Sequence, residues 1–343
     1  MRISCSVSFE AGYHVSLFIG SRASRGHVLS ITTDIFLFIA GIAALFLGGE
    51  SLIKGASRLA RGLGIHPIVI GLTVVGFGTS APELVVCIIA ALKGSSDIVL
   101  GNIVGSNIAN IGLILGITAL ISPISIEMKL IKVEVLLMIV LSIALYAISW
   151  NLGLGRIEGV FLFGSLLIFT IYSYYGALRE SNRVKQEYKE FIGDNSSILK
   201  QAAFIVIGLA LLVVGARLIV DSAISIATEF GISEVVIGIA AVAIGTSLPE
   251  LATSTVAAFR KENDIVVGNI IGSNIFNIGI LGLVSVIRPV SVNPEFLKFE
   301  YPVMALFAVL VLPIMKSGHR VSRPEGLILL LLYAAFLFTL FVL

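Results

Sequence analysis

Residues 78–84 read Gly-Thr-Ser-Ala-Pro-Glu-Leu and residues 245–251 read Gly-Thr-Ser-Leu-Pro-Glu-Leu, each within an otherwise apolar stretch. The offset of 167 residues between them holds without a gap into a second motif, which begins with Gly-Asn at Gly101 and again at Gly268. Over the 42 positions that end at Gly112, 23 residues are identical in the second copy. The chain is therefore predicted to be a duplicated half-protein with a polar, helix-breaking centre in each half.

The composition is that of a membrane protein. Of the 343 residues, 57% are hydrophobic and 13% are charged, and the mean hydropathy is +1.05. Because a soluble domain of this length needs far more polar surface, we expect a polytopic membrane protein. The net charge of +2 and the dispersed basic residues do not indicate nucleic-acid binding. The four histidines have no zinc-ligand spacing, and Cys5 and Cys87 are not expected to form a disulfide.

Ten apolar runs follow the first 32 residues, and each is near the ~20 residues with which an α-helix crosses hydrocarbon. They lack the two-residue alternation of a membrane β-barrel. We predict an all-α polytopic membrane protein with ten transmembrane helices, as two inverted five-helix repeats at residues 33–177 and 200–343. Residues 1–32 are expected to form a poorly ordered extension and residues 178–199 a cytoplasmic connector. The runs are 33–53, 65–92, 98–122, 130–150, 157–177, 200–221, 232–259, 265–288, 297–315 and 325–343.

Charge placement tests the inversion, because an odd number of helices per repeat turns the second copy over. With the amino terminus outside, the cytoplasmic loops hold fifteen Lys and Arg residues and the outer loops five. This asymmetry follows the positive-inside rule, although three arginines of the extension fall on the outside. Both termini are therefore predicted to be extracytoplasmic.

The first motif is predicted to interrupt a membrane helix. Pro82 cannot donate a hydrogen bond to the carbonyl of Gly78, and Pro249 likewise frees the carbonyl of Gly245. Irregular backbone at membrane depth persists only where it is buried in protein or lines a wet cavity. Such interrupted segments at corresponding positions of two halves point to the midplane site of a secondary transporter. Glu83 and its counterpart are costly in lipid, so we expect them to be functional.

The second motif places Asn102, Ser106 and Asn110 on one helical stripe, and the other half repeats the pattern from Asn269. Together the motifs offer carboxylate, hydroxyl, amide and carbonyl oxygens without nitrogen or sulfur ligands, which suits hard cations such as Ca²⁺ or Na⁺. Asn107 and Asn274 point off the stripe and are expected to pack between helices. For Asn102 and Asn269, coordination and packing both remain open.

These motifs resemble the two α-repeats of the Ca²⁺/cation antiporter superfamily, in particular its prokaryotic sodium/calcium exchanger branch. The resemblance covers residues 33–343. It implies a ten-helix fold in which the second, third, seventh and eighth helices bind ions and the first and sixth helices form a sliding gate. The ion ligands that it implies are Thr79, Ser80, Glu83, Ser106, Asn110, Thr246, Ser247, Glu250, Ser273 and Asn277.

One position departs from part of the family. Some relatives, including potassium-dependent exchangers, carry an aspartate where this chain has Asn277. The charge of the site is then set by Glu83 and Glu250 alone, which favours potassium independence. The cation/proton branch carries a different acidic motif, so the resemblance favours Na⁺ as the counter-ion.

The expected function is secondary antiport of Ca²⁺ against Na⁺ across the cell membrane by alternating access, at a midplane site between Glu83 and Glu250. The expected partners are the two ions and the lipid bilayer, with no cofactor and no enzymatic reaction. Ca²⁺/H⁺ antiport remains an alternative. A cation channel fits less well, because a simple pore needs no inverted repeat. An intramembrane protease also fits less well, because cation-type oxygens surround these carboxylates.

Overall fold

The computed structural model describes residues 31–126, 128–187, 198–230 and 245–342. Most of the expected N-terminal extension, the middle of the expected connector and the first half of the seventh expected span lie outside these residues. The helices are α1 (Ile31–Leu63), α2 (Pro67–Ile70), η3 (Gly71–Val75), α3 (Gly76–Thr79), α4 (Ala81–Lys93), α5 (Ser96–Ala109), η4 (Asn110–Leu115), α6 (Gly116–Ile121), α7 (Met128–Ile148), η5 (Ser149–Asn151), α8 (Arg156–Glu187), α9 (Ile198–Glu229), α11 (Leu248–Phe259), α12 (Asn263–Ile287), α13 (Pro294–Lys298), α14 (Glu300–Lys316), η6 (Ser317–His319) and α15 (Arg323–Val342).

Within the described ranges, eight helical segments are long and apolar enough to cross a membrane. A ninth is obtained if the bent pair Pro67–Thr79 and Ala81–Lys93 is one span, with a bend of 41°. The expected seventh span, 232–259, is described only from residue 245 onward, where it contains the twelve-residue helix α11. The molecule is thus a multi-pass helical protein, as its composition predicts.

Three helices continue beyond the apolar runs that predicted them. α1 extends from the predicted end at residue 53 to Leu63, α8 extends from 177 to Glu187, and α9 extends from 221 to Glu229. Their added turns are rich in Ala, Ser, Arg and Glu. A count of apolar residues finds only the part of a helix that suits hydrocarbon, whereas backbone hydrogen bonding continues the helix into the polar region.

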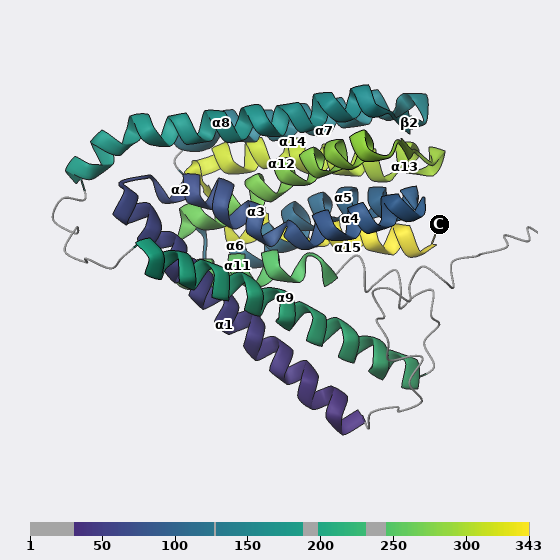
Figure 1. Ribbon diagram of the computed structural model, residues 1–343, viewed down its shortest axis with the longest axis horizontal. Coiled ribbons are helices and arrows are strands. Elements are labelled where there is room, and N and C mark those ends of the chain that lie inside the picture. Colours follow the sequence, from purple (N-terminus) through teal and green to yellow (C-terminus); the bar gives the residue numbers. More distant parts are fainter. Residues whose placement is uncertain (1–30, 127, 188–197, 231–244, 343) are drawn as a thin grey trace, which may run out of the picture.

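α1 and α9 lie side by side and run diagonally to the other long helices (Figure 1). Glycines allow this close approach. A Cβ on Gly48 would lie 2.9 Å from the carbonyl oxygen of Gly208, and a Cβ on Gly41 would lie 2.9 Å from that of Gly215. These glycines recur every seven residues on both helices. Small residues at such a seam let two membrane helices bring their backbones together.

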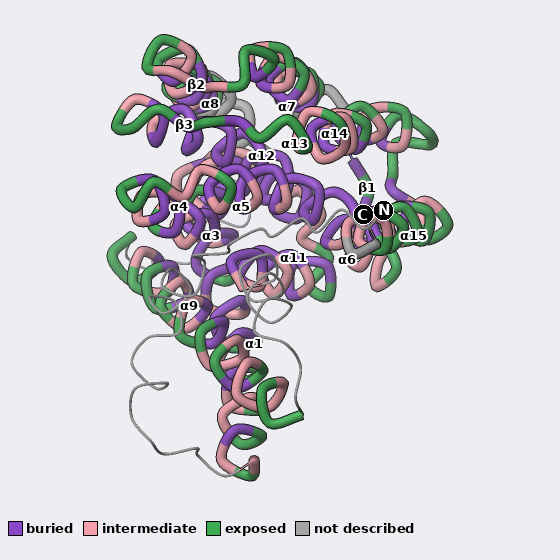
Figure 2. The backbone as a smooth tube through the Cα atoms, turned by 90° about the vertical axis from the view of Figure 1, so that its right-hand side faces the viewer, coloured by how far each residue is buried: buried purple, intermediate pink, exposed green. Residues whose placement is uncertain are grey.

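The core of the molecule surrounds α12 and the segment formed by α5, η4 and α6. In the most apolar stretches of these spans 83% and 78% of residues are buried, whereas the other spans are buried for 39% or less. Figure 2 shows the buried backbone gathered around α12 and α5. These two segments carry the second motif of each half, so the fold places both copies away from lipid.

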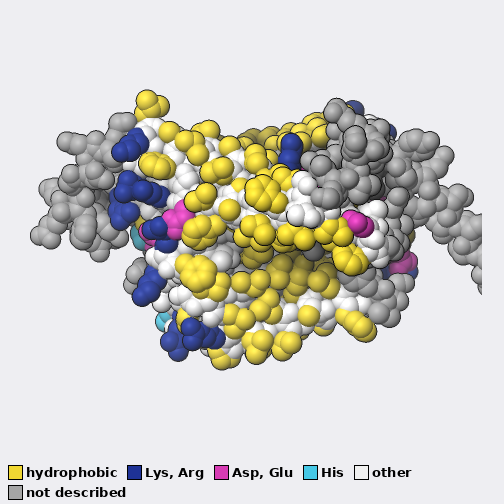
Figure 3. All heavy atoms as spheres, turned by 90° about the horizontal axis from the view of Figure 1, so that it is seen from below, with side chains coloured by type: hydrophobic (Ala, Val, Ile, Leu, Met, Phe, Trp, Pro, Cys, Tyr) yellow, Lys and Arg dark blue, Asp and Glu magenta, His cyan; other side chains and the backbone are white. Residues whose placement is uncertain are grey.

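The surface has the character expected for a bilayer-spanning protein. Figure 3 shows a broad apolar face with Lys and Arg side chains gathered toward one end. Two short antiparallel strand pairs join loops that are distant in sequence. β1 (Ile124–Ser125) pairs with β4 (Arg320–Val321), and β2 (Gly153–Leu154) pairs with β3 (Val290–Ser291).

Candidate cation-binding site

The first motif breaks its helix at the predicted place. Ser80 has φ −82° and ψ 3°, so it ends α3 and precedes α4. Pro82 then occupies the first turn of α4, where a missing N–H costs no intrahelical bond. In the second half, Ser247 has φ −86° and ψ −2° and precedes α11, with Pro249 in its first turn. Each break therefore presents its glutamate in the first turn of a new helix, where free backbone N–H groups favour a carboxylate.

Two π-helical segments, η3 and η4, lie next to the motifs of the first half. η3 directly precedes the broken turn, and η4 begins at Asn110. Such π-helical turns are rare in proteins, but those that occur are often at functional sites. The wider turn redirects side chains and backbone carbonyls. The stretch of α12 that is equivalent to η4 is an uninterrupted α-helix, so the two halves differ at this position.

The two carboxylates lie in one buried cluster. Glu83 and Glu250 are each 1% exposed. The hydroxyl of Ser80 donates to Oε1 of Glu250 over 3.3 Å, so the break in the first half contacts the carboxylate of the second. The hydroxyl of Ser106 donates to Oε1 of Glu83 over 3.4 Å and receives a hydrogen bond from Ser247 over 3.3 Å. Glu250 is thus bound by a hydroxyl of the opposite half, and Glu83 by a hydroxyl of its own half that the opposite half contacts in turn.

The threonines of the two breaks bind asparagines of the opposite half. The hydroxyl of Thr79 donates to Oδ1 of Asn269 over 3.1 Å. The amide nitrogen Nδ2 of Asn102 donates to the hydroxyl of Thr246, also over 3.1 Å. Thr79 further lies 3.4 Å from the hydroxyl of Ser273. Asn102 and Asn269, for which the sequence left coordination and packing open, thus each contact a threonine of the opposite half.

Four asparagines link α5 and η4 to α12. Nδ2 of Asn110 donates to Oδ1 of Asn274 over 3.1 Å, and Nδ2 of Asn277 donates to Oδ1 of Asn107 over 3.0 Å. These bonds confirm the interhelical role predicted for Asn107 and Asn274. Because they engage the amide nitrogens of Asn110 and Asn277, they leave the amide oxygens of those two residues for another partner.

Four buried oxygen atoms of the cluster have no hydrogen-bond partner among the residues that the structure describes: Oε2 of Glu83, Oε2 of Glu250, Oδ1 of Asn110 and Oδ1 of Asn277. A buried polar atom without a partner is costly, and native proteins almost always supply one. All four atoms are acceptors and two belong to carboxylates, a set whose chemistry suits a cation as the partner. Oxygen ligands of this kind suit Ca²⁺ and Na⁺.

All ten predicted ligand residues are 5% exposed or less. The structure links members of both halves directly, through the bonds Ser80–Glu250, Ser247–Ser106 and Thr79–Ser273. The sequence did not indicate that Asn102 and Asn269 contact the threonines of the opposite half. Both asparagines lie at the same sequence separation from the break in their own half, which indicates equivalent roles. A position along a helix does not, however, identify a contact with the other half.

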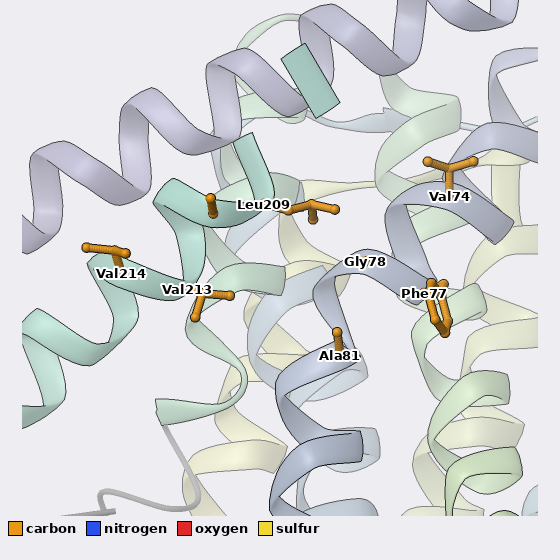
Figure 4. A pocket seen from close by; sticks show the side chains of 8 residues that line it. Val74, Phe77, Gly78, Ala81, Leu209, Val213 and Val214 are labelled. Atoms are coloured by element: carbon orange, nitrogen blue, oxygen red, sulfur yellow. The ribbon is translucent and has the colours of Figure 1, made fainter. Parts of the chain in front are cut away.

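An apolar cavity of about 610 Å³ lies beside the first break, between α9 and the segment η3–α4 (Figure 4). Phe77, Gly78 and Ala81 line one side, and Leu209 and Val213 line the other. A Cβ on Gly78 would lie 2.7 Å from Cδ2 of Leu209, so α9 packs directly against the broken turn. The lining side chains carry no oxygen ligand, and the cavity is distinct from the carboxylate cluster.

Comparison with known proteins bears on the function of this cluster. The sequence model of the family described as "Sodium/calcium exchanger protein" matches residues 33–175 and 200–342. The chain belongs to the sodium/calcium exchanger family. It is similar to the putative antiporter CaxA of Alkalimonas amylolytica, with 37% identity over 91% of this chain and 99% of the relative. It is also 34% identical to the sodium/calcium exchanger MaX1 of Methanosarcina acetivorans, over 91% of this chain and 99% of that protein.

A solved structure shares the fold. The sodium-calcium exchanger NCX_Mj, soaked with 2.5 mM Na⁺ and 10 mM Sr²⁺, superposes with a TM-score of 0.78 at 32% identity, covering 89% of this chain and 98% of that one. The family is one of membrane exchangers and not an enzyme family, and membership in it supports antiport of a cation against Ca²⁺. Family membership confirms the resemblance stated from the motifs.

Proposed function

We propose that this exchanger transports Ca²⁺ against Na⁺ across the cell membrane, and that the ions compete for one site between Glu83 and Glu250. The ten predicted residues supply its oxygens, and Asn107 and Asn274 orient the amide groups of Asn110 and Asn277. The observation that carries the proposal is the set of four buried acceptor oxygens in this cluster that have no partner within the described ranges.

The charge of the site explains why exchange is coupled. Two carboxylates give a maximal charge of −2. One Ca²⁺ neutralises both charges, whereas each Na⁺ neutralises one. An uncompensated pair of charges in a low-dielectric interior is strongly unfavourable. The charge-compensated site therefore permits the change of access, whereas the empty dianionic site opposes it. This difference prevents leak and enforces exchange.

The proposal includes the transmembrane arrangement. Ten helices in two inverted repeats, at residues 33–177 and 200–343, place both broken helices at the middle of the bilayer. The bias of basic residues places the termini outside the cell. Asn277 in place of an acidic residue leaves no third carboxylate, so transport is expected to proceed without K⁺.

The test is Ca²⁺ uptake into Na⁺-loaded proteoliposomes, with Glu83→Gln and Glu250→Gln compared with Glu295→Gln. Glu295 is an exposed carboxylate that pairs only with Lys298 among its described neighbours, so it is the matched control. Each site substitution removes one of the two charges and is expected to reduce uptake at least about 100-fold. The control variant is expected to transport normally.

Two further arms identify the counter-ion. Replacing the outward Na⁺ gradient by a pH gradient is expected to abolish uptake, and adding K⁺ is expected to change nothing. Uptake that follows the pH gradient instead would make protons the counter-ion. Uptake that persists in both glutamate variants would reject the site.

A further inference from the structure

The two halves of the site are not chemically equivalent. The difference lies in the asparagines that bind the two site threonines. Asn102 and Asn269 occupy equivalent positions, yet Asn102 uses its amide N–H₂ toward Thr246 whereas Asn269 uses its carbonyl oxygen toward Thr79. The two distances are both 3.1 Å. The same residue type thus donates in one half and accepts in the other.

The residue behind each asparagine accounts for this reversal. Nδ2 of Asn269 donates to the hydroxyl of Ser254 over 2.9 Å, which leaves its oxygen for Thr79. Cys87 stands at the position equivalent to Ser254. A thiol is a weak acceptor and can donate its S–H, so it is matched by a carbonyl and not by an N–H₂ group. Its sulfur lies 3.5 Å from Oδ1 of Asn102 and 3.9 Å from the carbonyl oxygen of Val99.

Burial makes the orientation of each amide consequential. Asn102 is 2% exposed, and Asn269, Cys87 and Ser254 are 0% exposed. Water therefore does not compete for the hydrogen bonds that these groups make. Turning Asn102 over would aim its N–H₂ at a sulfur, at the cost of a buried donor without a good partner.

The reversal changes what each threonine offers to a cation. A hydroxyl has one proton to donate and two lone pairs. Thr79 has acceptors at 3.1 Å in both Oδ1 of Asn269 and the carbonyl oxygen of Val75, so its proton is donated and Asn269 occupies neither of its lone pairs. Each threonine interacts with one carboxyl, Thr79 with that of Glu250 and Thr246 with that of Glu83. Thr246 also accepts the N–H of Asn102. Thr246 therefore has less capacity left for a metal ion.

We propose that Asn102 and Asn269 are positioning residues for the two site threonines, and that Cys87 weakens cation binding by the Thr246 side relative to the Thr79 side. This inference rests on the proposed cation site and adds an internal asymmetry to it. Serine at position 87 would accept the N–H₂ of Asn102 and turn its oxygen toward Thr246, as in the other half. Thr246 would then resemble Thr79.

The test compares Cys87→Ser, Ser254→Cys and the double exchange in the same proteoliposome assay. Cys87→Ser is expected to lower the KM for Ca²⁺ about three- to tenfold, which is the effect of one net hydrogen bond, with little change in maximal rate. Ser254→Cys is expected to raise the KM by a similar factor. In the double variant the asymmetry is moved to the other half, and the KM should lie between those of the two single variants.

The control is Ser285→Cys, because Ser285 is a fully buried serine of α12 that bonds only the carbonyl of Leu281 among the described groups. It is expected to leave the KM unchanged, so a general response to a buried thiol is separated from the proposed effect. Ser254→Cys, whose KM is expected to rise, keeps the inference testable if Cys87→Ser folds poorly.

The inference is overturned if Cys87→Ser and Ser254→Cys shift the KM in the same direction, or if neither shifts it more than Ser285→Cys. The glutamate variants separate this failure from that of the site. Loss of transport in Glu83→Gln and Glu250→Gln together with unchanged KM in the cysteine and serine variants would reject only the asymmetry.

Discussion

The contact between α1 and α9 makes a sharp prediction for Gly208→Ala. A Cβ there would lie 2.6 Å from the backbone nitrogen of Leu52 and 2.8 Å from the carbonyl oxygen of Gly48. Both atoms belong to helix backbone, so neither can move alone. Because ordinary contact begins near 3.4 Å, the two helices must separate by roughly 0.8 Å, the difference between 3.4 and 2.6 Å.

The magnitude follows from two opposing effects. Overpacking a close-packed contact costs about 1–3 kcal/mol, whereas replacing a helical glycine by alanine gains up to about 1 kcal/mol. We therefore expect a net loss of up to about 2 kcal/mol in the free energy of unfolding, or up to roughly 8 °C in Tm. Gly164→Ala in α8 is the matched control, because a Cβ on Gly164 would meet no atom within 4 Å. That variant should be neutral or slightly more stable.

The assay is the loss of monodisperse protein on size-exclusion chromatography after heating in one fixed detergent. Gly208→Ala should melt below wild type and Gly164→Ala should not. If Gly208→Ala melts at or above the temperature of Gly164→Ala, the close approach of α1 and α9 is incorrect, and the seam of glycines does not hold the two helices together.

Two further predictions concern polar contacts away from the carboxylates. Asn107→Ala removes the acceptor of the Asn277 amide and leaves a buried N–H₂ without that partner, so it should lower the free energy of unfolding by about 1–3 kcal/mol. The control Asn151→Ala, at an exposed position, should not change it. Equal melting temperatures for the two variants would contradict the asparagine network. Arg260→Gln removes the ion pair with Glu50, and this pair raises the pKa of Arg260. Since the two side chains are 49% and 26% exposed, the substitution should lower the free energy of unfolding by less than about 1 kcal/mol at low salt, and this effect should vanish near 1 M salt. An effect that persists at high salt would contradict an ion pair that salt screens.

Several features of the fold and the site followed from the sequence, because their causes act within one helical turn or through composition alone. Pro82 and Pro249, each two residues after a serine and directly before a glutamate, predicted both breaks, and the backbone turns at Ser80 and Ser247. The scarcity of charge predicted membrane-length helices. The burial of Glu83 and Glu250 followed from the cost of a carboxylate in lipid, which requires a protein-lined location.

Other features were decided by tertiary structure, because they depend on which segments meet across more than 140 residues of sequence. Gly41 and Gly48 are visible in the chain, but only packing shows that Gly215 and Gly208 lie opposite them. Helical spacing put Asn110 on the ligand stripe, but its free oxygen results from the bond of its nitrogen to Asn274. A hydrogen bond assigns each amide its donor and acceptor sides, and its geometry exists only after the two halves have come together.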